Sequence, residues 1–124
     1  AVEAALAGKT VVVYFSASWC PPCRKQTAMM VPFYRDHVAG GKAALEVVFV
    51  SADRDRAQFE GYLGEMPWLA VDYDDPRREK ILAMYKVKGI PKLMVFAKDG
   101  RLVAENAAGV PWTRQLLQSW MQHK

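Results

Sequence analysis

The chain has 124 residues, of which 52% are hydrophobic and 24% are charged. This length and composition suit one folded domain of residues 1–124 and argue against a disordered chain. The net charge of +4 is spread over scattered basic residues, which does not favour a nucleic-acid partner. The longest apolar run, Val11 to Phe15, is far too short to span a membrane. We therefore expect a single soluble domain that is monomeric and has no membrane partner.

The first half of the chain reads as strand, helix, strand and helix. Residues 11–15 and 45–50 are short apolar runs typical of strands that are buried on both faces. Between them, a helix is predicted to begin near Cys20, and Pro32 inside it predicts a kink. Helical spacing of apolar residues supports this helix and a second one after residue 50. The supporting residues are Met29, Met30, Phe33, Tyr34 and Val38 in the first helix, and Phe59, Tyr62 and Leu63 in the second.

The second half continues with a helix, a hairpin and a final helix. Apolar residues mark the two helices: Ile81, Leu82 and Tyr85 in one, and Leu116, Leu117, Trp120 and Met121 in the other. Residues 93–96 form a third apolar run, and Asp99-Gly100 predicts a hairpin turn to a strand at 102–103. Apolar strands that alternate with helices require a central sheet that is covered on both faces, so the fold class is α/β.

The two cysteines of the chain, Cys20 and Cys23, lie in Trp-Cys-Pro-Pro-Cys between the first predicted strand and helix. If Cys20 is the N-cap residue, its sulfur faces the free N–H groups of the first helical turn. The helix dipole favours the thiolate, so we expect the pKa of Cys20 to fall below the free value of about 8.5. Pro21 and Pro22 cost no helical hydrogen bond there and stiffen the turn.

The sequence offers three other roles for the cysteine pair, each with less support than a redox function. A structural disulfide across so short a loop would contribute only about 2 kcal/mol. A zinc site needs more ligands, and the histidines, His37 and His123, are far apart in sequence. Two unreactive core thiols are the third alternative. The position between strand and helix favours a redox-active pair, which requires no metal and no cofactor because its electrons reside in the sulfurs.

A second motif, Gly89-Ile90-Pro91, precedes the strand at 93–96. A proline that opens a strand after glycine is a candidate for a cis peptide bond. Such a bond would turn the backbone of Ile90 outward, where it is free to pair with an extended substrate. The alternative is that Pro91 merely begins a strand.

Together these motifs resemble the thioredoxin fold. The Cys-Pro-Pro-Cys sequence, with residues 14–18, 50–54 and 65–71, is similar to the tryparedoxin and nucleoredoxin branch, and most to nucleoredoxin-like proteins. The resemblance runs from residue 8 to residue 103 and fades after Ala104. It implies a three-layer α/β/α sandwich with a central mixed sheet and helices on both faces.

The resemblance also implies a thiol–disulfide oxidoreductase that reduces protein disulfides and is recycled by an upstream dithiol reductant. Cys20 would attack the substrate disulfide, and Cys23 would resolve the mixed disulfide. Lys92 stands where threonine is common in the family. With Arg24 it would either add a positive field near Cys20 and favour acidic partners, or both would be solvated surface charges. The expected substrate-binding residues are Trp19, Pro21, Pro22, Ile90 and Pro91.

The chain departs from its apparent relatives at two places. Tyr14 stands where thioredoxins proper carry a buried aspartate that accepts a proton from the second cysteine. The tryparedoxin branch also has a tyrosine at this position. Residues 52–54, Ala-Asp-Arg, stand where tryparedoxins carry Trp-Asp-Glu. The loss of an aromatic platform and an acid argues against a cationic glutathione–spermidine substrate.

Two further functions fit the same motifs. One is a redox-regulated protein-binding module of nucleoredoxin type with little turnover, which holds a partner on a surface near residues 66–68 and Pro91. The other is an oxidising thioredoxin of a secretory compartment. Residues 1–8 lack the charged start and hydrophobic segment of a signal peptide, so we expect a cytoplasmic location unless a leader has been trimmed.

Overall fold

The computed structural model describes residue 6 and residues 8–122. Within this part of the chain lies a five-stranded sheet with the order β3-β2-β1-β4-β5. Strands β1, β2 and β3 are parallel, whereas β4 is antiparallel to β1 and β5 is antiparallel to β4, so the sheet is mixed. The strands are β1 (Thr10–Ser16), β2 (Leu45–Ser51), β3 (Leu69–Ala70), β4 (Lys92–Phe96) and β5 (Leu102–Ala104).

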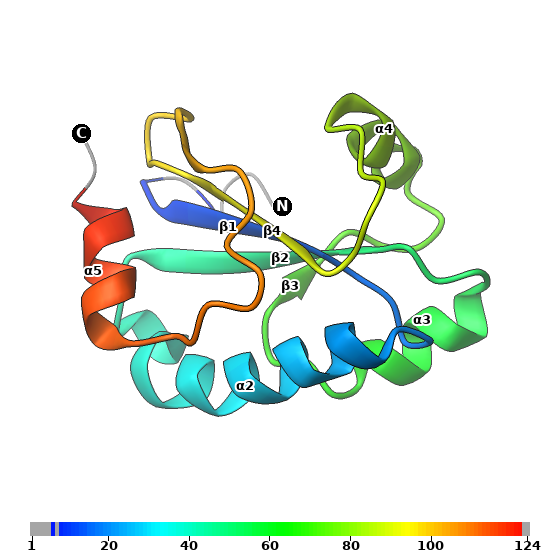
Figure 1. The fold of residues 1–124 in the computed structure, drawn as a ribbon, viewed down its shortest axis with the longest axis horizontal. Helices are drawn as coiled ribbons and strands as arrows, with labels where there is room; N and C mark the ends of the chain where they lie inside the picture. Colours follow the sequence, from blue (N-terminus) through cyan, green and yellow to red (C-terminus); the bar gives the residue numbers. More distant parts are fainter. Residues whose placement is uncertain (1–5, 7, 123–124) are drawn as a thin grey trace.

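Helices cover both faces of the sheet, which confirms the predicted three layers. Helices α2 (Pro21–His37) and α3 (Arg56–Leu63) lie on one side, and α4 (Pro76–Met84) lies on the other (Figure 1). Helix α5 (Arg114–Met121) buries Leu117 and Trp120 in the same core as α2. Pro32 lies inside α2, which continues to His37. None of the helices in the described part of the chain is both long and apolar enough to cross a bilayer.

The alternation of side chains along β1 divides the interior into two cores. Val12 and Tyr14 point into the larger core beneath α2, α3 and α5. Val11, Val13 and Phe15 pack into the core beneath α4. This period of two is what a strand between two helical layers requires, because successive side chains point to opposite faces.

The chain after Ala104 belongs to the fold, although the family resemblance fades there, and it contains the predicted C-terminal helix, α5. Ala107, Trp112, Leu117 and Trp120 are all buried in the larger core. The rings of Trp112 and Trp120 meet edge to face with their centroids 6.1 Å apart. The edge strand β3 was also not predicted, because two residues are too few to show a strand pattern.

We predict that Leu117→Ala destabilises the protein by about 2 to 5 kcal/mol, because it removes buried methyl groups and leaves a cavity. The measurement is urea unfolding, with Gln115→Ala on the exposed side of α5 as the matched control. Equal unfolding free energies for the two variants would show that α5 does not contribute to the core.

Candidate active site

Cys20 is the N-cap residue of α2, as the sequence predicted. Its sulfur accepts a hydrogen bond from the backbone N–H of Cys23, with an N–S distance of 3.3 Å. The two cysteines form a disulfide, and their Cα atoms lie 5.2 Å apart. Cys20 is 6% exposed and Cys23 is fully buried, so a partner molecule can reach only the first sulfur.

A chain of buried hydroxyl groups lies beneath the disulfide. The Tyr14 hydroxyl donates to the backbone carbonyl of Cys23 at 2.9 Å and lies 2.7 Å from the Thr27 hydroxyl. The hydroxyls of Thr27 and Tyr62 are 2.6 Å apart, and those of Tyr62 and Ser16 are 2.8 Å apart. Because each hydroxyl has one proton to donate, the bonds run in one direction, from Ser16 through Tyr62, Thr27 and Tyr14 to Cys23.

Tyr14 is therefore a donor in this site rather than a base. Burial raises the pKa of Tyr14 well above its usual range, and the neighbouring Tyr62 raises it further. A phenol in this state keeps its proton at neutral pH. Its bond to the carbonyl of Cys23 instead attaches the first turn of α2 to strand β1.

Asp53 fixes the loop that leads to Cys20, and the sequence motifs did not identify this role. Its carboxylate accepts hydrogen bonds from the backbone N–H and the hydroxyl of Ser18, both at 2.7 Å. The Ser51 hydroxyl donates to the other carboxylate oxygen at 2.7 Å. The residue is only 4% exposed, so these donors replace water as the partners of a buried charge.

Arg78, on α4, supports the same region from the other face of the sheet. It is 8% exposed and donates to the backbone carbonyls of Ser51 at 2.9 Å and Tyr73 at 2.8 Å. Its guanidinium also lies over the Tyr73 ring, 4.1 Å from the centroid. The end of β2, which carries Ser51 and leads to Asp53, is thus held in a fixed position.

The Ile90–Pro91 segment lies directly beside the disulfide. The peptide bond between these residues is cis, which confirms the prediction. The carbonyl oxygen of Ile90 is 3.8 Å from Cys20 Sγ, and Ile90 packs against the small cluster formed by Ala17, Cys20 and Cys23. Two motifs that are far apart in the sequence therefore form one site.

Shallow grooves meet at this segment. Trp19 and Ile90 line one groove, Pro22 and Pro91 line another, and Lys92 lines a third together with Ile90 and Pro91. Trp19 is 43% exposed, and the Arg54 guanidinium lies over its ring at 4.6 Å. The structure thus gathers most of the predicted binding residues around Cys20, and Pro21 is exposed in the first turn of α2.

The structure also shows the surroundings of Arg24, Met66 and Trp68, which the sequence did not predict. Arg24 forms an ion pair with Glu65 at 3.0 Å and donates to the carbonyl of Ser18 at 3.2 Å, so a carboxylate already balances its charge. Met66 and Trp68 were expected near a partner surface but are 9% and 6% exposed, because they pack in the larger core. These two side chains cannot form such a surface.

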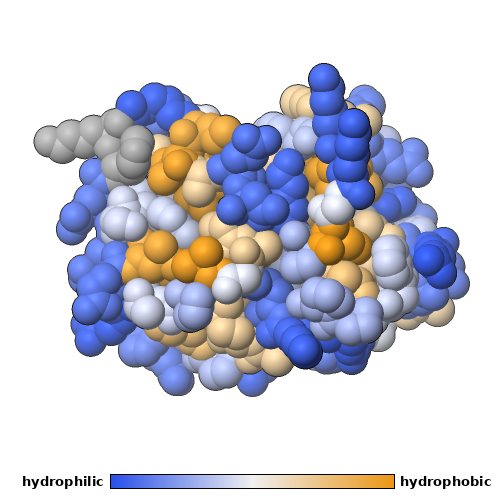
Figure 2. Space-filling view, in the orientation of Figure 1, coloured by the Kyte–Doolittle hydropathy of each residue, from blue (hydrophilic) through white to orange (hydrophobic). Residues whose placement is uncertain are grey.

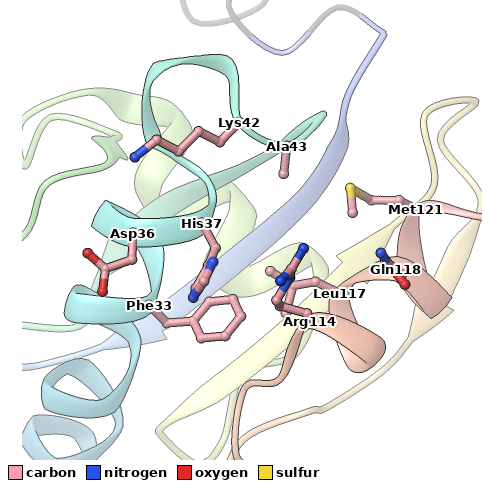
Figure 3. A pocket seen from close by; sticks show the side chains of 9 residues that line it. All are labelled: Phe33, Asp36, His37, Lys42, Ala43, Arg114, Leu117, Gln118 and Met121. Carbon is pink, nitrogen blue, oxygen red and sulfur yellow. The ribbon is translucent and has the colours of Figure 1, made fainter.

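Another hollow lies at the far end of α2, away from the cysteines. Figure 3 shows Phe33 and His37 facing the segment that carries Arg114, with Asp36 and Lys42 farther out. His37 lies against the Phe33 ring, with 4.5 Å between the ring centroids. His123, the other histidine considered as a zinc ligand, is outside the described residues, among which no group of three or more His, Cys, Asp or Glu could hold a metal.

Asp53→Ala should destabilise the protein by about 1 to 3 kcal/mol, because it leaves the donors of Ser18 and Ser51 without a partner. Asp36→Ala is the control, since Asp36 is an exposed carboxylate on α2. Urea unfolding of both variants measures the difference. An Asp53→Ala protein as stable as the control would contradict the anchoring role.

Comparison with known proteins agrees with this site. A family model described as thioredoxin-like matches residues 8–102. Probable nucleoredoxin 1 of Arabidopsis thaliana is 42% identical over 102 residues, which cover 82% of this chain and 18% of the relative. Nucleoredoxin of Mus musculus is 46% identical over 102 residues, which cover 82% of this chain and 23% of the relative. The matched part of the chain thus covers less than a quarter of the length of these two relatives.

Solved structures of tryparedoxins share the fold. Tryparedoxin II from C. fasciculata is 36% identical with a TM-score of 0.79, over 94% of this chain and 77% of the other. Tryparedoxin II complexed with glutathionylspermidine is 38% identical with a TM-score of 0.73, over 82% of this chain and 71% of the other. With its matching family model, its fold and its Cys20–Cys23 pair, the chain belongs to the thioredoxin-like family, among the relatives of nucleoredoxins and tryparedoxins.

Proposed function

We propose that the chain is a thiol–disulfide oxidoreductase that reduces protein disulfides. The observation that carries the proposal is the unequal setting of the two cysteines. Cys20 caps α2 and is the partly exposed one, whereas Cys23 is fully buried behind it. The positive end of the helix stabilises a thiolate at Cys20, which makes it the nucleophile, and Cys23 is positioned to attack only after a substrate has bound.

The reaction transfers two electrons from the dithiol to the substrate. The Cys20 thiolate attacks one sulfur of the substrate disulfide, the substrate S–S bond breaks, and the released substrate sulfur takes up a proton. Cys23 then loses its proton and attacks the sulfur of Cys20 in the mixed disulfide. The products are the second substrate thiol and the Cys20–Cys23 disulfide, which an upstream dithiol reductant returns to the reduced state.

The substrate binds where the grooves meet beside Cys20. Its extended backbone lies along Ile90 and Pro91. The carbonyl oxygen of Ile90 is 3.8 Å from the reactive sulfur of Cys20. Trp19 and Pro22 contact the substrate from either side, and Pro21 lies at the exposed start of α2. Lys92 contributes positive charge.

The proposed unit of function is a monomeric domain of residues 1–124 that acts in the cytoplasm. Support for a reducing compartment comes from the cysteine content, because both cysteines of the chain belong to the one redox pair and none is left for a structural disulfide.

A redox-regulated binding module is the second candidate. It is favoured by the exposed ring of Trp19 beside the disulfide and by relatives that are several times longer than this chain. In such a module the disulfide would change the affinity for a partner and would need to turn over only once.

Cys23→Ser should trap substrates as mixed disulfides with Cys20, because the second sulfur that would release them is absent. The test incubates the reduced variant with a disulfide-containing protein and examines the products on a non-reducing gel. Cys20→Ser is the control and should give at least about tenfold less adduct, because the remaining sulfur is buried. The reverse ratio would show that Cys23 is the nucleophile.

Turnover distinguishes the two candidate functions. With dithiothreitol as the electron source and a protein disulfide in excess over the enzyme, a reductase should release many equivalents of substrate thiol. Thiol release above the uncatalysed rate, measured with a chromogenic disulfide after the dithiothreitol is removed, is the readout. Release that stops at one equivalent would favour the binding module.

A further inference from the structure

One of the grooves at the site carries an excess of positive charge. It has a volume of about 560 Å³ and runs beside Ile90 and Pro91. Lys86, Lys88 and Lys92 line it, and Glu105 is the single acid among the lining residues. Figure 2 shows hydrophilic side chains gathered over the segment between α4 and β4, next to exposed apolar surface.

Within the described residues, no carboxylate forms an ion pair with Lys86, Lys88 or Lys92. In contrast, Arg24, the basic residue next to Cys23, is paired with Glu65. The lysines of this groove therefore add unpaired positive charge on the Pro91 side of the disulfide, alongside Lys25 of α2, which lines the neighbouring groove.

The backbone is held in place at two of the three lysines, Lys86 and Lys92. The N–H of Lys86 donates to the carbonyl of Ala83 at 3.1 Å, and Lys86 ends the turn after α4 with a positive φ of 51°. Lys92 is the first residue of β4 and pairs with Phe15 of β1. Since these two positions are fixed, their side chains extend from a defined edge of the site.

Ile90 connects the lysine groove to the reactive sulfur. The carbonyl of Ile90 lies 3.8 Å from Cys20 Sγ, and Ile90 itself lines the lysine groove. Residues that flank the reactive disulfide of an extended substrate therefore lie next to the lysines. Lys88 also lines the adjoining groove beside Trp19, so its charge reaches both sides of Ile90.

We propose that the lysine groove, formed by Lys86, Lys88 and Lys92, selects protein substrates that carry Asp or Glu next to the reactive disulfide. This inference rests on the proposed reductase function and names its substrate class. Clustered charge raises the association rate of an oppositely charged partner by about 10 to 1,000-fold, and salt screens the effect. Glu105 weakens the field and repels the same acidic residues.

The test measures single-turnover reduction of two peptides. Each contains one intramolecular disulfide, flanked by Glu in one peptide and by Gln in the other. The reduced, desalted protein is mixed with an excess of peptide, and quenched samples are separated by chromatography. At about 20 mM salt, we expect the Glu peptide to react roughly tenfold faster than the Gln peptide. At about 0.5 M salt, the two rates should agree within about twofold.

Charge variants locate the effect. Lys86→Gln/Lys88→Gln/Lys92→Gln should bring the ratio of the two rates close to one, whereas Glu105→Gln should increase it. The matched control removes the same charge from exposed sites that do not line the groove, in the variant Lys42→Gln/Lys80→Gln/Lys98→Gln. This control should keep the rate ratio of the unmodified protein. A ratio of one in the unmodified protein, or an equal fall in both triple variants, would overturn the proposed selectivity while the reductase function stands. Failure to reduce either peptide would overturn both.

Discussion

The sulfur of Cys20 accepts the N–H of Cys23 at the first turn of α2, and the chemistry proposed for this site depends on that contact. It places one cysteine at the positive end of a helix of 17 residues and the other inside the protein. The helix start favours a thiolate at the first position, which is also the more exposed of the two. The proposed order of attack and resolution therefore follows from where the helix begins.

The start of α2 must be held still for this arrangement to work, and two polar networks hold it. From below, hydroxyls on β1, α2 and α3 connect to the carbonyl of Cys23 through Tyr14. From the side, Asp53 ties the Ser18 loop to the end of β2. Both networks are enclosed and their members are paired with one another, which is the condition under which buried polar groups stabilise a defined geometry. The outer residues of the site, such as the exposed Trp19 and the half-buried Pro91, lie outside these two networks, so the surface charge around them can vary without disturbing the start of α2.

Local patterns in the sequence predicted much of this structure. The apolar run at 11–15 predicted β1, the two prolines after Cys20 predicted the helix start, and Gly89 before Ile90–Pro91 predicted the cis bond. The role of Asp53 could not be predicted, because its partner Ser18 is 35 residues away and pairing across the fold has no periodic signature. Trp68 was placed near a partner surface for a similar reason, since only tertiary packing against Tyr14 and Tyr34 shows that it is buried.

The equilibrium reduction potential of the Cys20–Cys23 pair tests the central claim most directly. Titration against glutathione redox buffers, with the thiols counted by alkylation and mass spectrometry, gives the value. A reductase whose nucleophile is stabilised by the helix start should have a reversible couple between about −270 and −200 mV, in the range of thioredoxin and glutaredoxins. A value near −120 to −180 mV, about that of an oxidant or isomerase, would reverse the proposed direction of electron flow. The absence of any reversible couple would contradict a redox function for the pair.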